Sequence, residues 1–315
     1  MQAVLAGSGE ELARNLLDLC KDEAQRDGVV AANGHQGLLM LLAAGPDSKT
    51  TEQALGALVL ITIDSAERRL RLLQAGVVDF TVALLRTVLT ASNQKSLSIA
   101  ACLVHNLTGT SASSEAWQKA GAIVPLVSLL GAEPAFARPA AGALCNLCDD
   151  PETRMAVNHT EIREAGAIPP LVALLHGAKA SNFAACTLQK LARGAAGAAA
   201  IRTAGGIVPL VALLHAAEAK TPGFAACALY NMSHFDQQSH PALLAALAAR
   251  PTPPPPHGGW LYLAMLLEKL VPTATERLTA AEAGDDAAAL QQAIDQAAAV
   301  RVADAELQPA RTKLA

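Results

Sequence analysis

The sequence contains few aromatic residues and no long uninterrupted apolar run. Phe, Trp and Tyr together make up 3% of the 315 residues, although 52% of the residues are hydrophobic, mostly Ala and Leu. This composition suits helices. Apolar and polar residues do not alternate over any long stretch, so a sheet protein is not expected. No apolar stretch of roughly 18 residues is free of charge, so no membrane span is expected.

The chain also lacks a strong charge of either sign and a secretory signal. A net charge of −4 and a pI of about 6.1 give no global basic field, so nucleic acid is not an expected partner. The first residues, 1–11, have no basic start and include Glu10 and Glu11, which is unlike a secretory signal.

Cysteines are few and do not have the spacing of a disulfide framework. They lie inside helical patterns, which is typical of small buried thiols in an intracellular protein. Cys145 and Cys148 form a CxxC pair, but a zinc site of four ligands needs a second pair and none follows. The expected location is the cytoplasm, with the nucleus as a second compartment. The six cysteines are Cys20, Cys102, Cys145, Cys148, Cys186 and Cys227.

Motifs that carry chemistry are missing as well. No glycine-rich phosphate loop follows a strand, and no Ser/His/Asp order, metal-spaced histidine cluster or carboxylate pair stands out. We therefore expect no catalytic residues, no cofactor and no metal, and the chain is predicted not to be an enzyme.

What the sequence does contain is a phrase that returns along the chain. It reads AGAIVPLVSLL at 120–130, AGAIPPLVALL at 165–175 and AGGIVPLVALL at 204–214, with looser copies at 75–85 and 32–42. A period near 40 residues indicates a stacked-repeat architecture. The second residue of each copy is Asn33, Gly76, Gly121, Gly166 or Gly205, in steps of 43, 45, 45 and 39 residues.

Each copy is followed by a second motif, of the type Leu-x-Asn-Leu, at the end of a predicted helix. We refer to its third residue as the signature position. The signature positions are Leu60, Asn106, Asn146, Lys190 and Asn231, and Lys269 corresponds to them in a degenerate last copy. The repeat pattern also predicts buried leucines at Leu126, Leu130, Leu144, Leu171, Leu175, Leu210, Leu214 and Leu229.

These motifs divide the chain into a repeat region and a tail. Residues 1–272 are predicted to begin in the middle of a repeat and to contain five clear units and a degenerate sixth. The prolines from Pro251 to Pro256 are expected to form a stiff spacer. Residues 273–315 form an alanine-rich tail that is expected to be partly helical or disordered, because alanine buries little apolar surface.

The two motifs together resemble the armadillo repeat family, over roughly residues 10–271. The resemblance implies an all-α, right-handed superhelical solenoid with three helices in each repeat. It also implies a concave groove that is lined by the third helices and binds extended peptides. Signature asparagines of that family point into the groove and bond the ligand backbone. The groove residues implied here are Asn106, Asn146, Lys190, Asn231 and Lys269.

The resemblance also bears on the ligand. Importin-α-like receptors carry a tryptophan one turn before the asparagine, where this chain has Cys102, Gly142 and Cys227, so basic nuclear-localisation peptides are disfavoured. Lys190 and Lys269 in place of asparagine favour acidic ligands, as in the β-catenin-like branch. The leading interpretation is a monomeric, non-enzymatic scaffold for a protein or peptide partner, most simply an acidic one.

Two other functions stay open at this point. An armadillo-like co-chaperone would open the nucleotide domain of an Hsp70 by clamping it with the whole concave face. An adaptor for ubiquitin ligation would join such repeats to a ligase, as plant proteins join them to a U-box.

A last regularity concerns lysine. The residue eleven positions before the signature is Lys49, Lys95, Ala135, Lys179 or Lys220. Each lysine lies beside or next but one to a predicted N-cap, as Lys49, Lys95 and Lys220 lie beside Thr50, Ser96 and Thr221, at the positive end of a third helix where a cation is least favourable. The lysines therefore predict a positive rim for an acidic partner, and the alternative is that they only keep a turn soluble.

Overall fold

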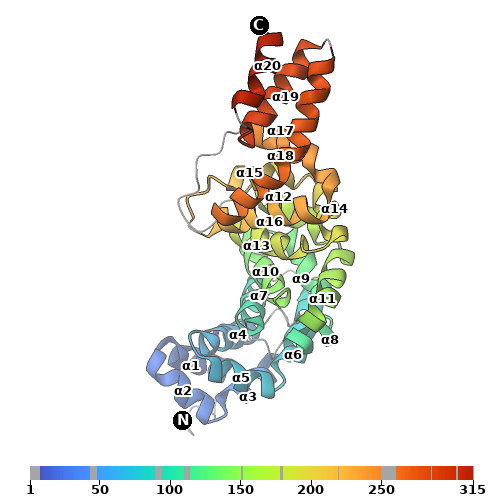
Figure 1. The fold of residues 1–315 in the computed structure, drawn as a ribbon. Coiled ribbons are helices and arrows are strands. Elements are labelled where there is room, and N and C mark those ends of the chain that lie inside the picture. The colour runs from blue at the N-terminus through green and yellow to red at the C-terminus, as the bar shows by residue number, and fades with distance from the viewer. Residues whose placement is uncertain are drawn as a thin grey trace. The chain divides into compact units, whose positions relative to one another are not determined.

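The computed structural model describes residues 8–42, 48–88, 94–109, 114–149, 152–177, 180–218, 220–249, 260–284, 286–302 and 304–314. These residues are organised as helices, and no strand occurs among them (Figure 1). The chain divides into two compact units, Met1–Ala167 and Ile168–Ala315. The proline tract at 251–256 and Lys179 lie outside the described residues.

The first unit starts with a single helix and continues in sets of three. The single helix, α1 (Gly9–Lys21), resembles the third helix of a repeat. The sets are α2 (Glu23–Ala31), α3 (Gly34–Leu41) and α4 (Lys49–Thr62); α5 (Ala66–Gln74), α6 (Val77–Val88) and α7 (Gln94–Thr108); and α8 (Ser114–Lys119), α9 (Ile123–Leu130) and α10 (Pro134–Leu147). The unit ends with α11 (Glu152–Glu164), the first helix of the next repeat.

The second unit contains the remaining repeats and the helices that follow them. They are α12 (Ile168–Leu174) and α13 (Ser181–Leu191); α14 (Ala195–Thr203), α15 (Ile207–Leu213) and α16 (Thr221–Phe235); the short 3₁₀ helix η3 (Gln237–Ser239), α17 (His240–Ala249) and α18 (Trp260–Ala283); and α19 (Ala287–Ala299) and α20 (Asp304–Leu314). In the sixth repeat, η3 stands where the other repeats have their first helix.

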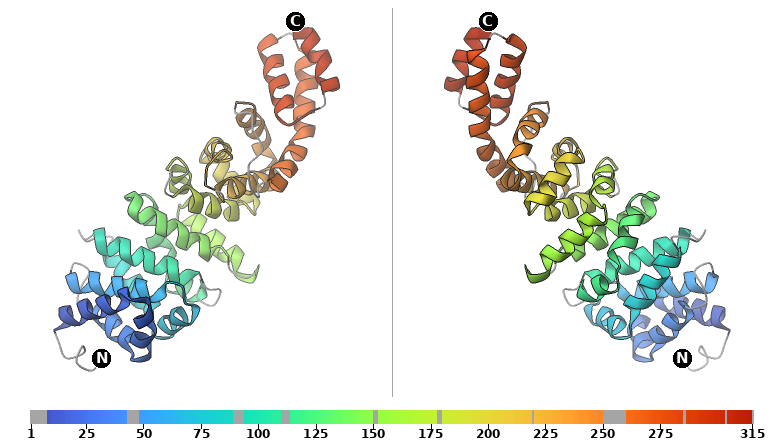
Figure 2. Two further views of the ribbon diagram at one scale, coloured as in Figure 1. Left: turned by 90° about the vertical axis from the view of Figure 1, so that its left-hand side faces the viewer. Right: turned by 90° about the vertical axis from the view of Figure 1, so that its right-hand side faces the viewer.

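Third helices pack on one another within each unit. In the first unit α4 packs against α1 and α7, and α10 packs against α7; in the second unit α16 packs against α13 and α18 (Figure 2). Each repeat thus buries its apolar side against its neighbours, as stacked repeats must. The prediction of an all-α stack of armadillo-type repeats is confirmed for the described residues.

The junction between the first and second helices has the same backbone conformation in every repeated phrase. Asn33, Gly76, Gly121, Gly166 and Gly205 all have positive φ, at 58°, 82°, 74°, 81° and 76°. In three of the five copies the next residue donates a backbone hydrogen bond back across the turn, as from Ala122 N to Trp117 O at 3.0 Å. This is the left-handed helix ending that glycine favours, because a side chain strains it.

Gly166→Ala tests this conformation without a packing effect. Nothing lies within 4 Å of a Cβ added there, so the expected loss of about 1–2 kcal/mol in unfolding free energy comes from positive φ alone. Gly131 has equally free space and a φ of −86°. Gly131→Ala should therefore not destabilise the chain. Urea unfolding of both variants is the measurement, and equal losses would contradict the argument.

The predicted core leucines are all buried. Leu126, Leu144, Leu171, Leu210 and Leu229 have no exposed surface, and Leu130, Leu175 and Leu214 are at most 4% exposed. The prolines of the phrase occupy the first turn of the second helices, as in α9 and α15, where an N–H has no helical partner.

Leu171→Ala is expected to lower the unfolding free energy by about 2–5 kcal/mol, because it leaves a cavity in a closely packed core. Val208 is the second residue of α15 in the next repeat and is 64% exposed, so Val208→Ala should have little effect. Thermal or urea unfolding followed by circular dichroism measures both.

The predicted N-caps are wrong in detail. Ser48, not Thr50, caps α4: its side chain accepts from Thr51 N at 3.0 Å. Ser96 lies within α7 and is fully buried, and Thr221 is the first residue of α16. The hydroxyl residues lie close together in sequence, so their spacing did not show which one has the extended backbone that a cap requires.

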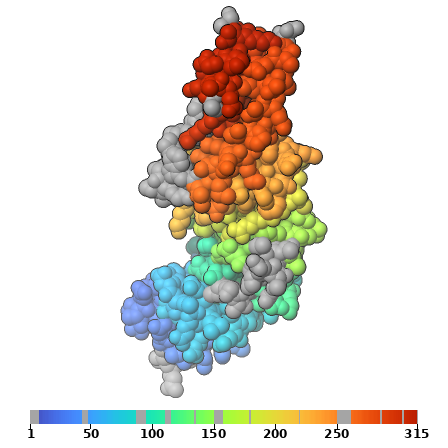
Figure 3. All heavy atoms as spheres, viewed as in Figure 1, coloured from blue at the N-terminus to red at the C-terminus, as the bar shows by residue number. Residues whose placement is uncertain are grey.

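The residues of the predicted tail include the end of α18 and two further helices. The boundary at 272–273 lies inside α18, which continues to Ala283. α19 and α20 pack against α18, visible as the red atoms lying on orange ones in Figure 3. The apolar contacts come from the few larger side chains between the alanines, since Leu290, Ile294, Val300, Val302 and Leu307 are buried.

Candidate functional site

The signature asparagines of the first unit link successive third helices. Asn106 on α7 donates through Nδ2 to Thr62 Oγ1 at 2.9 Å, at the end of α4. Asn146 on α10 donates to His105 O at 3.1 Å and to Thr108 Oγ1 at 3.3 Å, at the end of α7. Both amides therefore repeat one geometry, in which a side chain of one repeat bonds the end of the preceding third helix.

Asn231 repeats this arrangement in the second unit. It lies on α16, is 8% exposed, and donates through Nδ2 to Gln189 O of α13 at 2.9 Å. Lys190, at the signature position of α13, is buried at 5% exposure, whereas Lys269 on α18 is exposed. The Nδ2 groups of the asparagines thus hold neighbouring third helices together. No hydrogen bond to their Oδ1 atoms is formed within the described residues.

The predicted lysine rim is a row of ion pairs in the first unit. Lys49 at the start of α4 lies 3.6 Å from Glu10 of α1, and Lys95 at the start of α7 pairs with Glu52 in the first turn of α4. Each lysine therefore faces a carboxylate of the preceding third helix. In the second unit Lys220 is exposed at the N-cap of α16. Exposed pairs of this kind contribute about 0–1 kcal/mol each.

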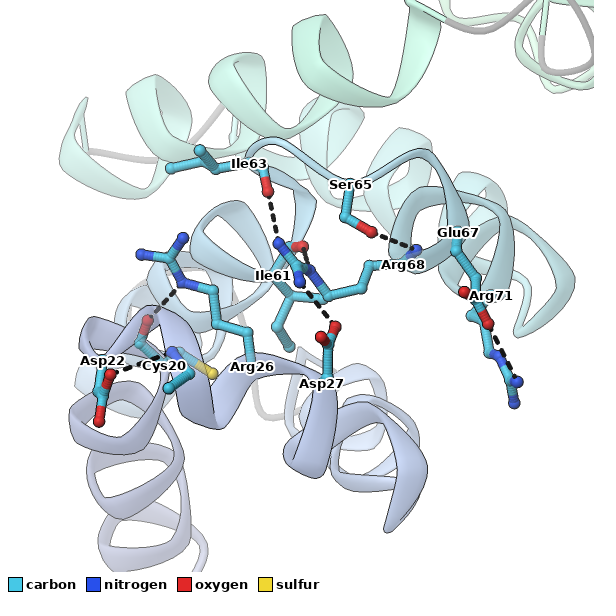
Figure 4. A network of polar contacts seen from close by, with 11 residues as sticks. Cys20, Asp22, Arg26, Asp27, Ile61, Ile63, Ser65, Glu67, Arg68 and Arg71 are labelled. Atoms are coloured by element: carbon cyan, nitrogen blue, oxygen red, sulfur yellow. Dashed lines mark hydrogen bonds and ion pairs between the residues drawn. The ribbon is translucent and has the colours of Figure 1, made fainter.

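A buried arginine network at the repeat junctions was not predicted from the sequence (Figure 4). Arg68 of α5 donates to Ile61 O, to Ile63 O and to Asp27 Oδ1 at 2.7–2.8 Å. Arg26 of α2 donates to Cys20 O at 2.8 Å. Each guanidinium thus meets carbonyls at the end of the preceding third helix, where a cation is favoured. The signal in the sequence is an arginine six or seven residues after the residue whose carbonyl it meets near the helix end.

Arg68→Ala is expected to lower the unfolding free energy by about 2–3 kcal/mol, because it strands two buried carbonyls that a charged donor satisfies. The carboxylate of Asp27 is largely exposed, so Asp27→Asn should cost less than about 1 kcal/mol. The urea midpoints of the two variants separate the contribution of the hydrogen bonds to the carbonyls from that of the ion pair with Asp27. Equal losses would show that the pair dominates.

The thiols and the inner histidines are held in their neutral forms by burial. Burial raises the pKa of the Cys20 thiol to about 11 and raises the pKa of Cys102 and Cys227. Burial also lowers the pKa of His35 and His105. Thiols of this kind are poor nucleophiles.

Neither a metal site nor a membrane-crossing helix emerges from the parts of the chain that the structure describes. Three or more metal-ligating side chains do not come together anywhere in those ranges. No helix there is by itself long and apolar enough to cross a membrane, and α14 and α15 reach that size only as a pair bent by 92°.

An aromatic cluster in the second unit was also missed. The rings of Tyr230 and Tyr262 lie 5.9 Å apart, and His234 stacks on Tyr230 at 6.2 Å. Phe235 meets His234 edge-on at 4.6 Å. We call these four residues the aromatic cluster. It joins α16 to α18, and His234 lies one turn after Asn231. Contacts between residues some 30 positions apart left no local pattern in the sequence.

Solved structures with a similar fold identify the architecture. An engineered protein aligns with 99% of this chain and 77% of its own, at a TM-score of 0.74 and 24% identity. A designed armadillo repeat protein in complex with the peptide (KR)4 aligns with 73% of this chain and 97% of its own, at a TM-score of 0.61 and 23% identity. A structure of computationally designed armadillo repeat proteins for modular peptide recognition aligns with 84% of this chain and 98% of its own. The TM-score is 0.59 and the sequence identity is 23%.

No family model and no curated protein sequence matches the chain. The chain therefore resembles armadillo repeat proteins through its fold and its two repeated motifs.

Proposed function

We propose that the chain is a non-enzymatic scaffold that binds an extended peptide along the exposed side of its third helices. The main support is the geometry of the signature asparagines. In each unit the Asn amide is held by the preceding third helix, as Asn146 is by His105 O. This fixes the orientation of the side chain and leaves its carbonyl oxygen as an acceptor. Acceptors at the same place in three of the repeats suit the N–H groups of an extended peptide.

The fold itself supports peptide recognition. One of the similar structures is a designed armadillo repeat protein in complex with a peptide, and others were designed for modular peptide recognition. The peptide in the first case is basic, (KR)4. The ligand charge that this chain prefers therefore has to be argued from its own residues.

Charge in the second unit favours an acidic peptide. Neither α13 nor α16 contains an Asp or a Glu, while His234 is exposed on α16. Lys269 is exposed on α18 beside Glu268. Complementary charge of this kind acts mainly on the association rate and weakens as salt rises. In the first unit, by contrast, Lys49 and Lys95 are already paired with carboxylates.

The proposed location is the cytoplasm, with the nucleus as a second compartment. All six cysteines are free, which supports a reducing compartment.

Peptides of alternating Glu and Ala, Gln and Ala, or Lys and Ala test the proposal. The Glu-Ala peptide, labelled with fluorescein, should bind most tightly in fluorescence anisotropy, and its affinity should fall with salt. Lys269→Gln should weaken it by up to about fivefold, the scale of one exposed charge pair.

Lys21→Gln is the matched control, since Lys21 is an exposed lysine on α1 that pairs with Asp18 of the same helix. Its effect on binding should be nil. Tighter binding of the Lys-Ala peptide would overturn the acidic preference, and no binding of any peptide would overturn the scaffold. Acceleration of ADP release from an Hsp70 in the absence of peptide binding would favour the co-chaperone instead.

A further inference from the structure

Aromatic side chains are scarce in this protein and are not used evenly. The chain has two Trp, two Tyr and five Phe. Trp117 is fully buried and Phe136 nearly so, as expected of aromatic side chains in a core. Both tyrosines of the chain, however, contact each other in the aromatic cluster, where Tyr230 and Tyr262 meet at 5.9 Å with an interplanar angle of 46°.

The aromatic cluster is only partly covered by the rest of the second unit. Phe235 is 40% exposed and Tyr262 is 38% exposed, and Leu261, next to Tyr262, is 66% exposed. Exposed apolar surface that is gathered in one place marks an interaction site far more often than isolated exposed residues do. Packing of α16 on α18 therefore accounts for the contact between the two tyrosines but not for the apolar surface that stays exposed.

The surroundings of the aromatic cluster carry little negative charge. α16, which carries three of its residues, and α13, which packs on α16, have no carboxylates, whereas α18 carries Glu268 beside Lys269. Asp236 follows Phe235 but is engaged by Arg202 and Ser239 at 2.7 and 2.8 Å and is 9% exposed. Lys269 lies two turns after Tyr262, on the same side of α18, and is exposed.

We infer that the aromatic cluster is a specificity site that receives an aromatic side chain of an acidic peptide. The inference rests on the proposed function and goes further, because it assigns one ligand side chain to one place. The ligand ring packs on Tyr230 and Tyr262, and the carboxylates that flank it face Lys269. His234 provides a polar edge beside the ring.

The geometry favours a ring over an aliphatic side chain. Tilted and edge-on pairs are the arrangements that aromatic rings prefer, and the aromatic cluster already holds one of each. A further ring can extend this arrangement, whereas an aliphatic side chain gains only from buried area. The thiol of Cys227 lies beside the aromatic cluster. Burial raises the pKa of this thiol, and hydrogen bonds with Gln189 and Tyr262 lower it.

The experiment compares two labelled peptides that differ at one residue. One has a Phe at the centre of a run of Glu, and the other has Ala at that place. The Phe peptide should bind about tenfold more tightly to the wild type, the scale of one buried aromatic anchor. Tyr262→Ser should abolish this preference and leave the weaker binding of the Ala peptide in place. Circular dichroism confirms that the variant is folded.

Phe80→Ser supplies the matched control. Phe80 lies on α6 in the first unit and is 40% exposed, like Phe235, but belongs to no aromatic pair in the described structure. The preference for the Phe peptide should survive this change. Phe235→Ser should reduce the preference, because it removes the ring that supports His234.

The outcomes separate the two proposals. Binding of both acidic peptides without a preference for Phe would overturn the specificity site and leave the scaffold standing. A preference that persists in Tyr262→Ser would also overturn it. A failure of both peptides to bind would overturn the scaffold. Concentration-dependent self-association that Tyr262→Ser abolishes, with no peptide binding, would show that a second copy covers the aromatic cluster instead.

Discussion

The repeat depends on one residue of positive φ between its first and second helices. That residue ends one helix and starts the next at a fixed angle, so that the apolar side of each helix meets the neighbouring repeat. At Gly76, Gly166 and Gly205 no neighbouring atom would meet a Cβ, so the requirement there is one of backbone conformation. Asn33 meets it too, since asparagine tolerates this conformation better than most residues. The faint first copy of the phrase therefore keeps the property that matters for folding.

The sequence was sufficient to predict the fold class and the buried leucines. Both follow from a short local pattern: the phrase sets the helix boundaries, and helical periodicity then places Leu171 or Leu229 on the core side. Contacts between repeats are different. Asn146 meets His105, and Arg68 meets Asp27, about 40 residues away, so these partners depend on how the helices stack. Nothing in the local sequence fixes that register.

The same limit explains the errors at helix ends and in the tail. Ser48 and Thr50 both carry a hydroxyl group that can cap a helix, and only the backbone conformation shows that Ser48 is the extended residue. In the tail, alanine dominates the composition, but Leu290 and Ile294 recur at helical spacing and reach the core. The aromatic cluster could not be foreseen either, because Tyr230 and Tyr262 are brought together only by the packing of α16 on α18.

The ion pairs along the first unit have a consequence for the length of the array. α4 carries a lysine at its start that pairs with the helix before it and a glutamate in its first turn that pairs with the helix after it. α4 therefore has a donor for one neighbour and an acceptor for the other, whereas α7 has Lys95 but no acidic residue in its first turn. Loss or duplication of the repeat that ends with α4, by unequal recombination, would bring Lys95 opposite Glu10, or a second lysine opposite Glu52, with no charge left alone. At this place the array can lose or gain a repeat and still form an ion pair between each two neighbouring third helices.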